Sequence, residues 1–428
     1  MQDRMLTARL FALALAAGAL AAPDAYAQQP SSYTGPGSCA AAICHGSIRP
    51  IAGSRILQTE YSTWLVQDKH AKATDVLTSP VSGRMAKILG LPRADTAPKC
   101  LACHGLNAPE ASRARTFAEE GVSCEACHGP ASAWLGPHTV RGWTHAQSIQ
   151  LGMYDTKDPV KRTERCASCH VGTADAFVDH AMIAAGHPDL VFDLETFSAA
   201  MPRHWQEPPP DERVRTWAIG QLVQLRESLD RLGRRAASAS WPEYAELDCF
   251  ACHHNLTRPE DSWRQDRGYP DRQPGTAPWN QSRLDIGRLV VRAFDATEGD
   301  RFDTATARLA ADVAKTPLDR AQVAQTTKEL AAIVESSIAR ARTAPVDAAL
   351  TTRLLRAILE NGERIAAHGE RSAEQAAMSL DTLMAAHTVD RQASRPALDR
   401  VFQQLENPSA YDPRKFVAEL RRIGELVK

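Results

Sequence analysis

Ten cysteines form the clearest chemical pattern in the sequence. They fall into five pairs, and a histidine directly follows the second cysteine of every pair. The five segments are Cys39-AAAI-Cys44-His45, Cys100-LA-Cys103-His104, Cys124-EA-Cys127-His128, Cys166-AS-Cys169-His170 and Cys249-FA-Cys252-His253. Four segments have two residues between the cysteines, and the first has four. Each segment therefore brings two thiols and one imidazole together in one short stretch of chain.

This spacing is the attachment signature of c-type haem. Two thiols must reach two vinyl groups of one macrocycle, and the adjacent imidazole must turn onto the iron. Five disulfides or several zinc sites would also use paired cysteines, but neither requires a histidine after every second cysteine. We therefore expect five covalently bound haem c groups, with a lengthened loop at the first.

Nine further histidines are candidates for the second axial position of each iron. They are His70, His138, His145, His180, His187, His204, His254, His368 and His387. We expect at least one of His180, His187 and His204 to be a ligand, because they lie close together in the half that bears the motifs. His254 directly follows His253, so it is better placed for a propionate or a neighbouring haem. His368 and His387 lie on expected amphipathic helices and should face solvent.

Methionine is the other common axial ligand and would raise the reduction potential. Met153, Met182 and Met201 leave that option open, although we expect them to fill the core.

The first 27 residues have the features of a secretory signal peptide. Arg4 and Arg9 precede an apolar run from Leu10 to Ala22, and Ala25-Tyr26-Ala27 offers a cleavage site. The run is too short to cross a bilayer of about 30 Å comfortably. We expect a mature periplasmic chain that begins near Gln28 and has no stable membrane span.

Composition divides the rest of the chain in two. All ten cysteines and all eight tryptophans lie before residue 281, and a loop from Gln273 to Pro278 is rich in proline and glycine. We expect a mainly α-helical fold with long loops: a pentahaem cytochrome domain over 28–280, organised around stacked haems, followed by a helical bundle over 281–428. The net charge is −1 and basic and acidic residues are interspersed, so the sequence has no basic segment that would indicate nucleic-acid binding.

Apolar periodicity indicates individual helices. One is expected over 213–233. In the tail, Thr316-Pro317 should start a helix, and breaks near Pro345, Pro396 and Pro413 give a bundle of about five helices.

Residues 38–170 resemble the cytochrome c-554 family of multihaem carriers associated with hydroxylamine oxidation. The marks are the first motif followed by Trp64 and His70-AKA, then CLACH, GVSCEACHGPASAWLGPH and RTERCASCH in that order. The widened first motif, the fifth motif and the cysteine-free tail depart from the family, whose members have four haems.

The resemblance implies a ligand set. His70 would pair with His128, and His138 with His170. The first haem would take its second ligand from His180, His187 or His204, and the second haem would be five-coordinate, which makes His104 the proximal ligand of an open iron.

These observations favour a non-enzymatic electron carrier between redox proteins or quinol-linked donors and acceptors. The alternative is a haem oxidoreductase that uses one five-coordinate iron to act on a small nitrogen or sulfur compound.

Overall fold

The computed structural model describes residues 31–54, 56–115, 117, 119–206, 209–239, 241–249, 252–253, 278–386 and 391–427. The expected signal peptide, most of the expected boundary loop, His254 and His387 lie outside the described residues.

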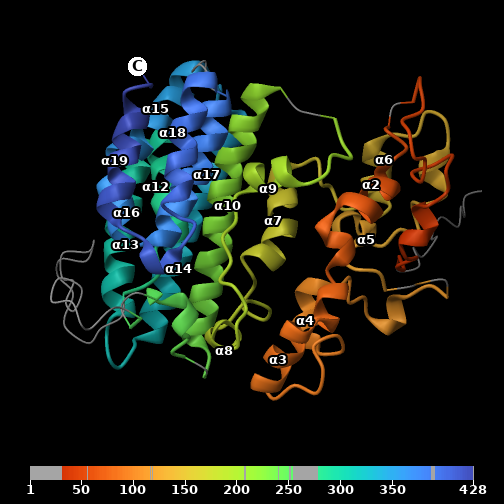
Figure 1. Ribbon diagram of the computed structural model, residues 1–428, viewed down its shortest axis with the longest axis horizontal. Helices are drawn as coiled ribbons and strands as arrows, with labels where there is room; N and C mark the ends of the chain where they lie inside the picture. Colours follow the sequence, from red (N-terminus) through yellow and green to blue (C-terminus); the bar gives the residue numbers. More distant parts are fainter. Residues whose placement is uncertain are drawn as a thin grey trace, which may run out of the picture.

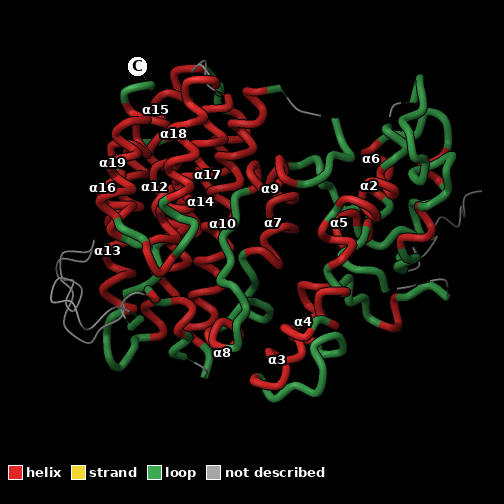
Figure 2. The backbone as a smooth tube through the Cα atoms, in the orientation of Figure 1, coloured by secondary structure: helices red, strands yellow, loops and turns green. Residues whose placement is uncertain are grey.

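The expectation of a mainly α-helical fold with long loops is confirmed. Figure 1 shows long parallel and antiparallel helices gathered at one side of the molecule and short helices at the other, with α7 and α9 between them. Figure 2 shows that loops make up much of the part with short helices and little of the other. The described residues contain two isolated β-bridges, Tyr33 with Arg113 and Leu247 with Trp279, and no strand.

The part that bears the first four motifs is built from short helices. These are α2 (Glu60–Gln67), α3 (Pro80–Ile88), α4 (Pro98–His104), α5 (Cys124–His128), α6 (His145–Gln150), α7 (Pro159–His170), α8 (His180–Ala184) and α9 (Leu194–Ala200).

The long helices form a bundle. It consists of α10 (Pro210–Ala237), α12 (Ser282–Phe294), α13 (Ala296–Val313), α14 (Arg320–Thr343), α15 (Ala348–Glu360), α16 (Gly362–Ala367), α17 (Glu370–Ala386), α18 (Arg391–Gln403) and α19 (Pro413–Gly424).

Helix α10 belongs to the core of this bundle. Trp217, Leu222 and Leu229 are buried in one apolar cluster with side chains of α12, α14 and α17. Gly233 allows a close approach to α14, because a Cβ atom there would lie 2.4 Å from the hydroxyl oxygen of Thr327. The expected domain boundary near residue 280 stays a prediction, but the bundle core also contains a helix that precedes it.

Two expectations about the tail are wrong. The tail contains eight described helices where about five were expected, because further breaks fall at Asp295, Asn361 and Gly369. Pro396, where a break was expected, lies inside α18. The following turns stay helical since Leu398 and Val401 are buried in the bundle. Helix α14 begins at Arg320 and not at Pro317, because Asp319 accepts a hydrogen bond from the backbone nitrogen of Gln322 and caps the helix there.

The bundle holds α7 by charged contacts. Arg226 of α10 donates to Glu164 at 2.5 Å, and Arg342 of α14 donates to both carboxylate oxygens of Asp158 at 2.7 and 2.9 Å. Helix α7 carries the fourth motif at its end, so these contacts fix its position against the bundle.

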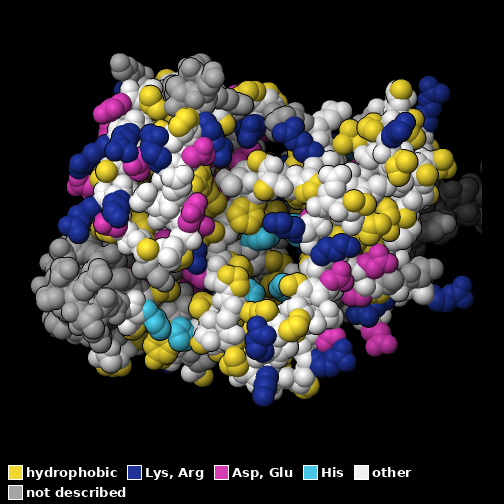
Figure 3. All heavy atoms as spheres, viewed as in Figure 1, with side chains coloured by type: hydrophobic (Ala, Val, Ile, Leu, Met, Phe, Trp, Pro, Cys, Tyr) yellow, Lys and Arg dark blue, Asp and Glu magenta, His cyan; other side chains and the backbone are white. Residues whose placement is uncertain are grey.

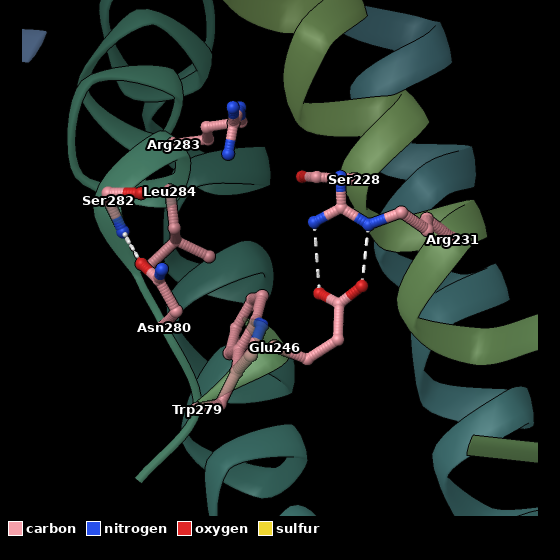
Figure 4. Close-up of a pocket in the computed structure, with 8 residues that line it drawn as sticks. All are labelled: Ser228, Arg231, Glu246, Trp279, Asn280, Ser282, Arg283 and Leu284. Atoms are coloured by element: carbon pink, nitrogen blue, oxygen red, sulfur yellow. Dashed lines mark hydrogen bonds and ion pairs between the residues drawn. The ribbon is translucent and has the colours of Figure 1, made fainter. Parts of the chain in front are cut away.

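A buried ion pair joins the bundle to two motifs. Arg231 of α10 makes two hydrogen bonds to Glu246, at 2.5 and 3.0 Å, across the pocket in Figure 4. The same guanidinium donates to the backbone oxygen of Val171, which follows the fourth motif, and Glu246 precedes Cys249 of the fifth. One side chain thus ties α10 to both attachment segments.

We predict that Arg231→Ala lowers the free energy of unfolding by about 3–5 kcal/mol, because it leaves the buried Glu246 carboxylate without its partner. Urea unfolding of the haem-loaded protein, followed by far-ultraviolet circular dichroism, measures the loss. Arg234→Ala on the same helix is the matched control, since Arg234 pairs with Asp175 in solvent and its loss should not be measurable. Equal effects of the two variants would contradict a special role for the buried pair.

Candidate haem sites

Three attachment motifs form the last turn of a helix. Helices α4, α5 and α7 end at His104, His128 and His170, the histidines of the second, third and fourth motifs. Cysteines three residues apart lie on one face of such a turn, so the helix presents both thiols on the same side. In the fifth motif the backbone nitrogen of His253 donates to the oxygen of Cys249 at 2.8 Å, which closes the same kind of turn. We call the motifs I to V in chain order.

Motif I uses its two extra residues to make a separate turn. Cys39 ends a short 3-10 helix (Pro36–Cys39), and the chain turns again so that the backbone nitrogen of Cys44 donates to Ala41 at 2.8 Å. Ile43 in this turn is 82% exposed. The lengthened loop therefore projects outward and leaves Cys44 and His45 together.

Four of the five attachment histidines have a second histidine ring as a neighbour. The centroids of the two imidazole rings are 6.2 Å apart for His45 and His138, 6.2 Å for His104 and His187, 6.1 Å for His170 and His70, and 6.2 Å for His253 and His180. The remaining attachment histidine, His128 of motif III, interacts electrostatically with His204. Figure 3 shows histidine side chains in the hollowed region where the bundle meets the other part of the chain.

The repeated distance fits two ligands of one metal ion. Imidazoles that bind a metal from opposite sides have centroids about 6 Å apart, because each metal–nitrogen bond is about 2.0 Å long. Direct contacts between aromatic rings spread over about 4.5–7 Å, so the repetition of nearly one distance in four pairs is what favours ligation. The four measured pairs therefore fit an iron between the rings, and the cysteines of each motif fit a covalently bound porphyrin.

Hydrogen bonds at Nδ1 leave Nε2 of many of these rings available to a metal. Nδ1 donates to a backbone oxygen in four of them: His104 to Ala73 at 3.0 Å, His138 to Leu135 at 2.5 Å, His187 to Pro188 at 2.8 Å and His204 to Pro202 at 3.4 Å. Such a bond fixes the tautomer and the orientation of a ligating imidazole.

Two rings are supported by carboxylates instead. Nδ1 of His45 lies 3.0 Å from Glu60, and Nδ1 of His70 lies 2.9 Å from Asp68. Burial alone would raise the pKa of Asp68, but hydrogen bonds from the side chain and backbone of His70 hold it below its ordinary value. The Asp68 carboxylate is therefore ionised at neutral pH.

Two attachment histidines are neutral because of their surroundings. Burial, with a smaller contribution from the positive charge of His204, lowers the pKa of His128 to about 4. Burial and the proximity of His70 likewise lower the pKa of His170 to about 4. Neutral imidazole is the form that binds a metal, so both rings are ready to ligate at pH 7.

The pairing of His70 differs from that implied by the resemblance. The backbone oxygen of His70 accepts a hydrogen bond from Val122, beside motif III, but its ring points to His170 of motif IV and not to His128. The backbone lies near one motif and the side chain near another.

The pairing of His138 also differs. Its ring faces His45 of motif I and not His170. Glu125 of motif III explains this, because its buried carboxylate accepts hydrogen bonds from the backbone nitrogens of Thr34, Gly35 and Ala131. It thereby ties the chain before motif I to the loop that carries His138. Glu125 was not predicted from the sequence, where its only signal is the position of an acidic residue between the two cysteines of motif III.

The implied open iron at motif II is not supported by the geometry. His187 lies opposite His104, with the two ring planes at 84°. His187 and His180 were candidates for motif I, but they face motifs II and V, because α8 and the turn after it lie beside those motifs.

Two other histidines lie outside the pairs. Nε2 of His145 binds Asp155 at 2.9 Å, so that nitrogen is already occupied. His368 does not face solvent as expected, because its Nδ1 binds the buried Asp285 at 2.8 Å inside the bundle.

The attachment sites adjoin one another in an order that differs from the chain order. Cys39 of motif I contacts Cys124 of motif III, and Cys103 of motif II contacts Cys169 of motif IV. Cys127 of motif III interacts with Cys166 of motif IV. Lys99, next to Cys100, pairs with Asp179, next to His180. The resulting spatial order is I, III, IV, II, V.

None of the ten cysteines, all of which lie within the described residues, forms a disulfide. No group of three or more histidine, cysteine or acidic side chains within the described residues is arranged to hold a bare metal ion. In the part of the chain that the structure describes, no helix is both long and apolar enough to span a membrane.

Comparison with known proteins gives one family. Residues 39–129, which include motifs I to III, match the model of the cytochrome c554 and c-prime family. No curated protein and no solved structure matches the chain. The match confirms the resemblance seen in the motifs, and it agrees with the helical fold and the paired histidines. Residues 39–129 are thus cytochrome c-554-like, and the match supports a c-type cytochrome.

Proposed function

We propose that this cytochrome carries five haem c groups, each held by two cysteines and by two histidines, and that it relays electrons between redox partners. The observation that carries the proposal is the repeated separation of 6.1–6.2 Å between an attachment histidine and a second histidine. When bound, the haems supply one-electron oxidation and reduction at iron. Two histidines on each iron favour electron carriage over substrate chemistry, because no position is left for a substrate.

The spatial order of the motifs supports a single relay. Contacts between cysteines join I to III and IV to II, the electrostatic interaction of Cys127 with Cys166 joins III to IV, and the ion pair between Lys99 and Asp179 joins II to V. Each haem would then have its nearest neighbours along one path. Motifs I and V are its two ends, and partners would exchange electrons there.

The setting of this relay is the periplasm. The signal-like segment before Gln28 supports export, and haem is attached to c-type cytochromes outside the cytoplasm. We propose redox proteins or quinol-linked donors and acceptors as the partners.

We predict that the double variant Cys39→Ser and Cys44→Ser loses one haem per chain and keeps four. The two thiols of motif I are its only covalent links to a porphyrin, despite their wider spacing. Haem content per chain, measured by the pyridine haemochrome assay and intact mass, gives the number. Ile43→Ala, in the exposed part of the same loop, should retain five. A haem count unchanged by the double variant would rule out motif I as an attachment site.

We predict that His187→Ala converts one low-spin ferric haem to high spin, because the position opposite His104 becomes open. Electron paramagnetic resonance of the oxidised protein detects the change. His145→Ala is the control, since its Nε2 is occupied by Asp155, and it should leave all haems low-spin. A stoichiometric high-spin signal already present in the unaltered protein, and unaffected by His187→Ala, would favour an open iron at motif II.

A further inference from the structure

We propose that Glu60 and Asp68 lower the reduction potentials of the haems at motifs I and IV relative to a haem whose ligands donate only to backbone oxygens. The inference rests on the proposed function, because it assumes that His45 and His70 bind iron. Glu60 and Asp68 would act through these histidines as positioning residues and would not touch the haem iron themselves.

The carboxylates differ in charge from the other acceptors at Nδ1. A neutral backbone oxygen accepts the Nδ1 proton of His104 and of His187, both at motif II. A carboxylate accepts it at His45 and His70. An ionised acceptor draws the proton from the ring and makes the imidazole a stronger electron donor, which stabilises ferric iron over ferrous iron.

Burial makes the effect of Asp68 the stronger of the two. Its side chain is 3% exposed, against 17% for Glu60, so water screens its charge less. Both the Nδ1 atom and the backbone nitrogen of His70 lie 2.9 Å from Oδ1 of Asp68. Oδ1 of Asp68 is thus directed at His70 alone. The carboxylate of Glu60 has two different partners, because its second oxygen accepts a hydrogen bond from the backbone nitrogen of Leu57 at 2.9 Å.

The ring planes make the two haems distinguishable. The planes of His45 and His138 lie within 6° of parallel, whereas those of His70 and His170 cross at 86°. The angle between axial imidazole planes sets the splitting of the iron orbitals that hold the unpaired electron. Parallel planes give a rhombic ferric signal, and crossed planes give a strongly anisotropic one. The haem at motif I should therefore be rhombic, and those at motifs IV and II anisotropic.

Asp68→Asn and Glu60→Gln test the proposal, because each keeps the shape and the hydrogen-bond acceptor and removes the charge. A redox titration of the haem-loaded protein, followed by electron paramagnetic resonance, measures all five midpoints. We expect Asp68→Asn to shift one anisotropic centre to higher potential and Glu60→Gln to shift, by less, the most rhombic centre, since the ring planes lie at 6° for motif I and at 32° for motif V. Asp155→Asn is the matched control, since Asp155 makes the same 2.9 Å contact with His145, which is not a proposed ligand. It should shift none.

Two results would overturn the proposal. Midpoints unchanged in both variants, with all haems still low-spin, would show that the charge does not tune the iron. Appearance of high-spin haem in either variant would show that the carboxylate holds the ligand in place and does not tune it. Failure of the proposed function looks different, because the unaltered protein would then bind fewer than five haems or lack low-spin signals.

Discussion

The separation of 6.1–6.2 Å between facing imidazoles is the constraint on which the rest of this structure depends. An attachment motif fixes only one histidine of each pair. The second comes from a distant part of the chain, and the loop that carries it must be held to within a fraction of an ångström for a metal to bind both. Side-chain caps help to hold two of these segments. Asp68 caps the turn that bears His70, and Asp179 caps α8, which begins at His180.

The same constraint gives the bundle a role. The large apolar core lies in the bundle, whereas the two other apolar clusters contain only a few residues each. Segments that bear the motifs therefore have little core of their own and depend on covalent haem and on outside contacts for rigidity. The bundle supplies such contacts through Arg226, Arg231 and Arg342, which hold α7 and the segments around motifs IV and V. We infer that the helical bundle, α10 included, supports the segments that bear the motifs.

The attachment motifs, the long helix α10 and the ten paired histidines could be predicted from the sequence, because each depends on local spacing or on residue type. Which of these histidines face each other could not be predicted. His70 shows why: its backbone lies beside motif III, and only the direction of the ring assigns it to motif IV. The prediction that His368 faces solvent was wrong for a related reason. An amphipathic pattern does not show that Asp285, on another helix, is buried in the bundle where it can bind His368. Local patterns predict elements and cofactors, while ring direction and buried partners depend on tertiary packing.

The hydrogen-bond acceptor at Nδ1 of the paired histidines also differs between motifs along the proposed relay. This difference affects where an electron would be most stable. Motif III lies between motifs I and IV, which have the carboxylates. Among the described residues, Nδ1 of His128 is buried with no hydrogen-bond partner, and the bond from His204 to Pro202 is long at 3.4 Å. A haem held by these two rings would lack the carboxylate support found at motifs I and IV, so its ferrous form would be more stable than that of either neighbour. His128 and His204 would in this way favour an electron inside the proposed relay, away from both ends.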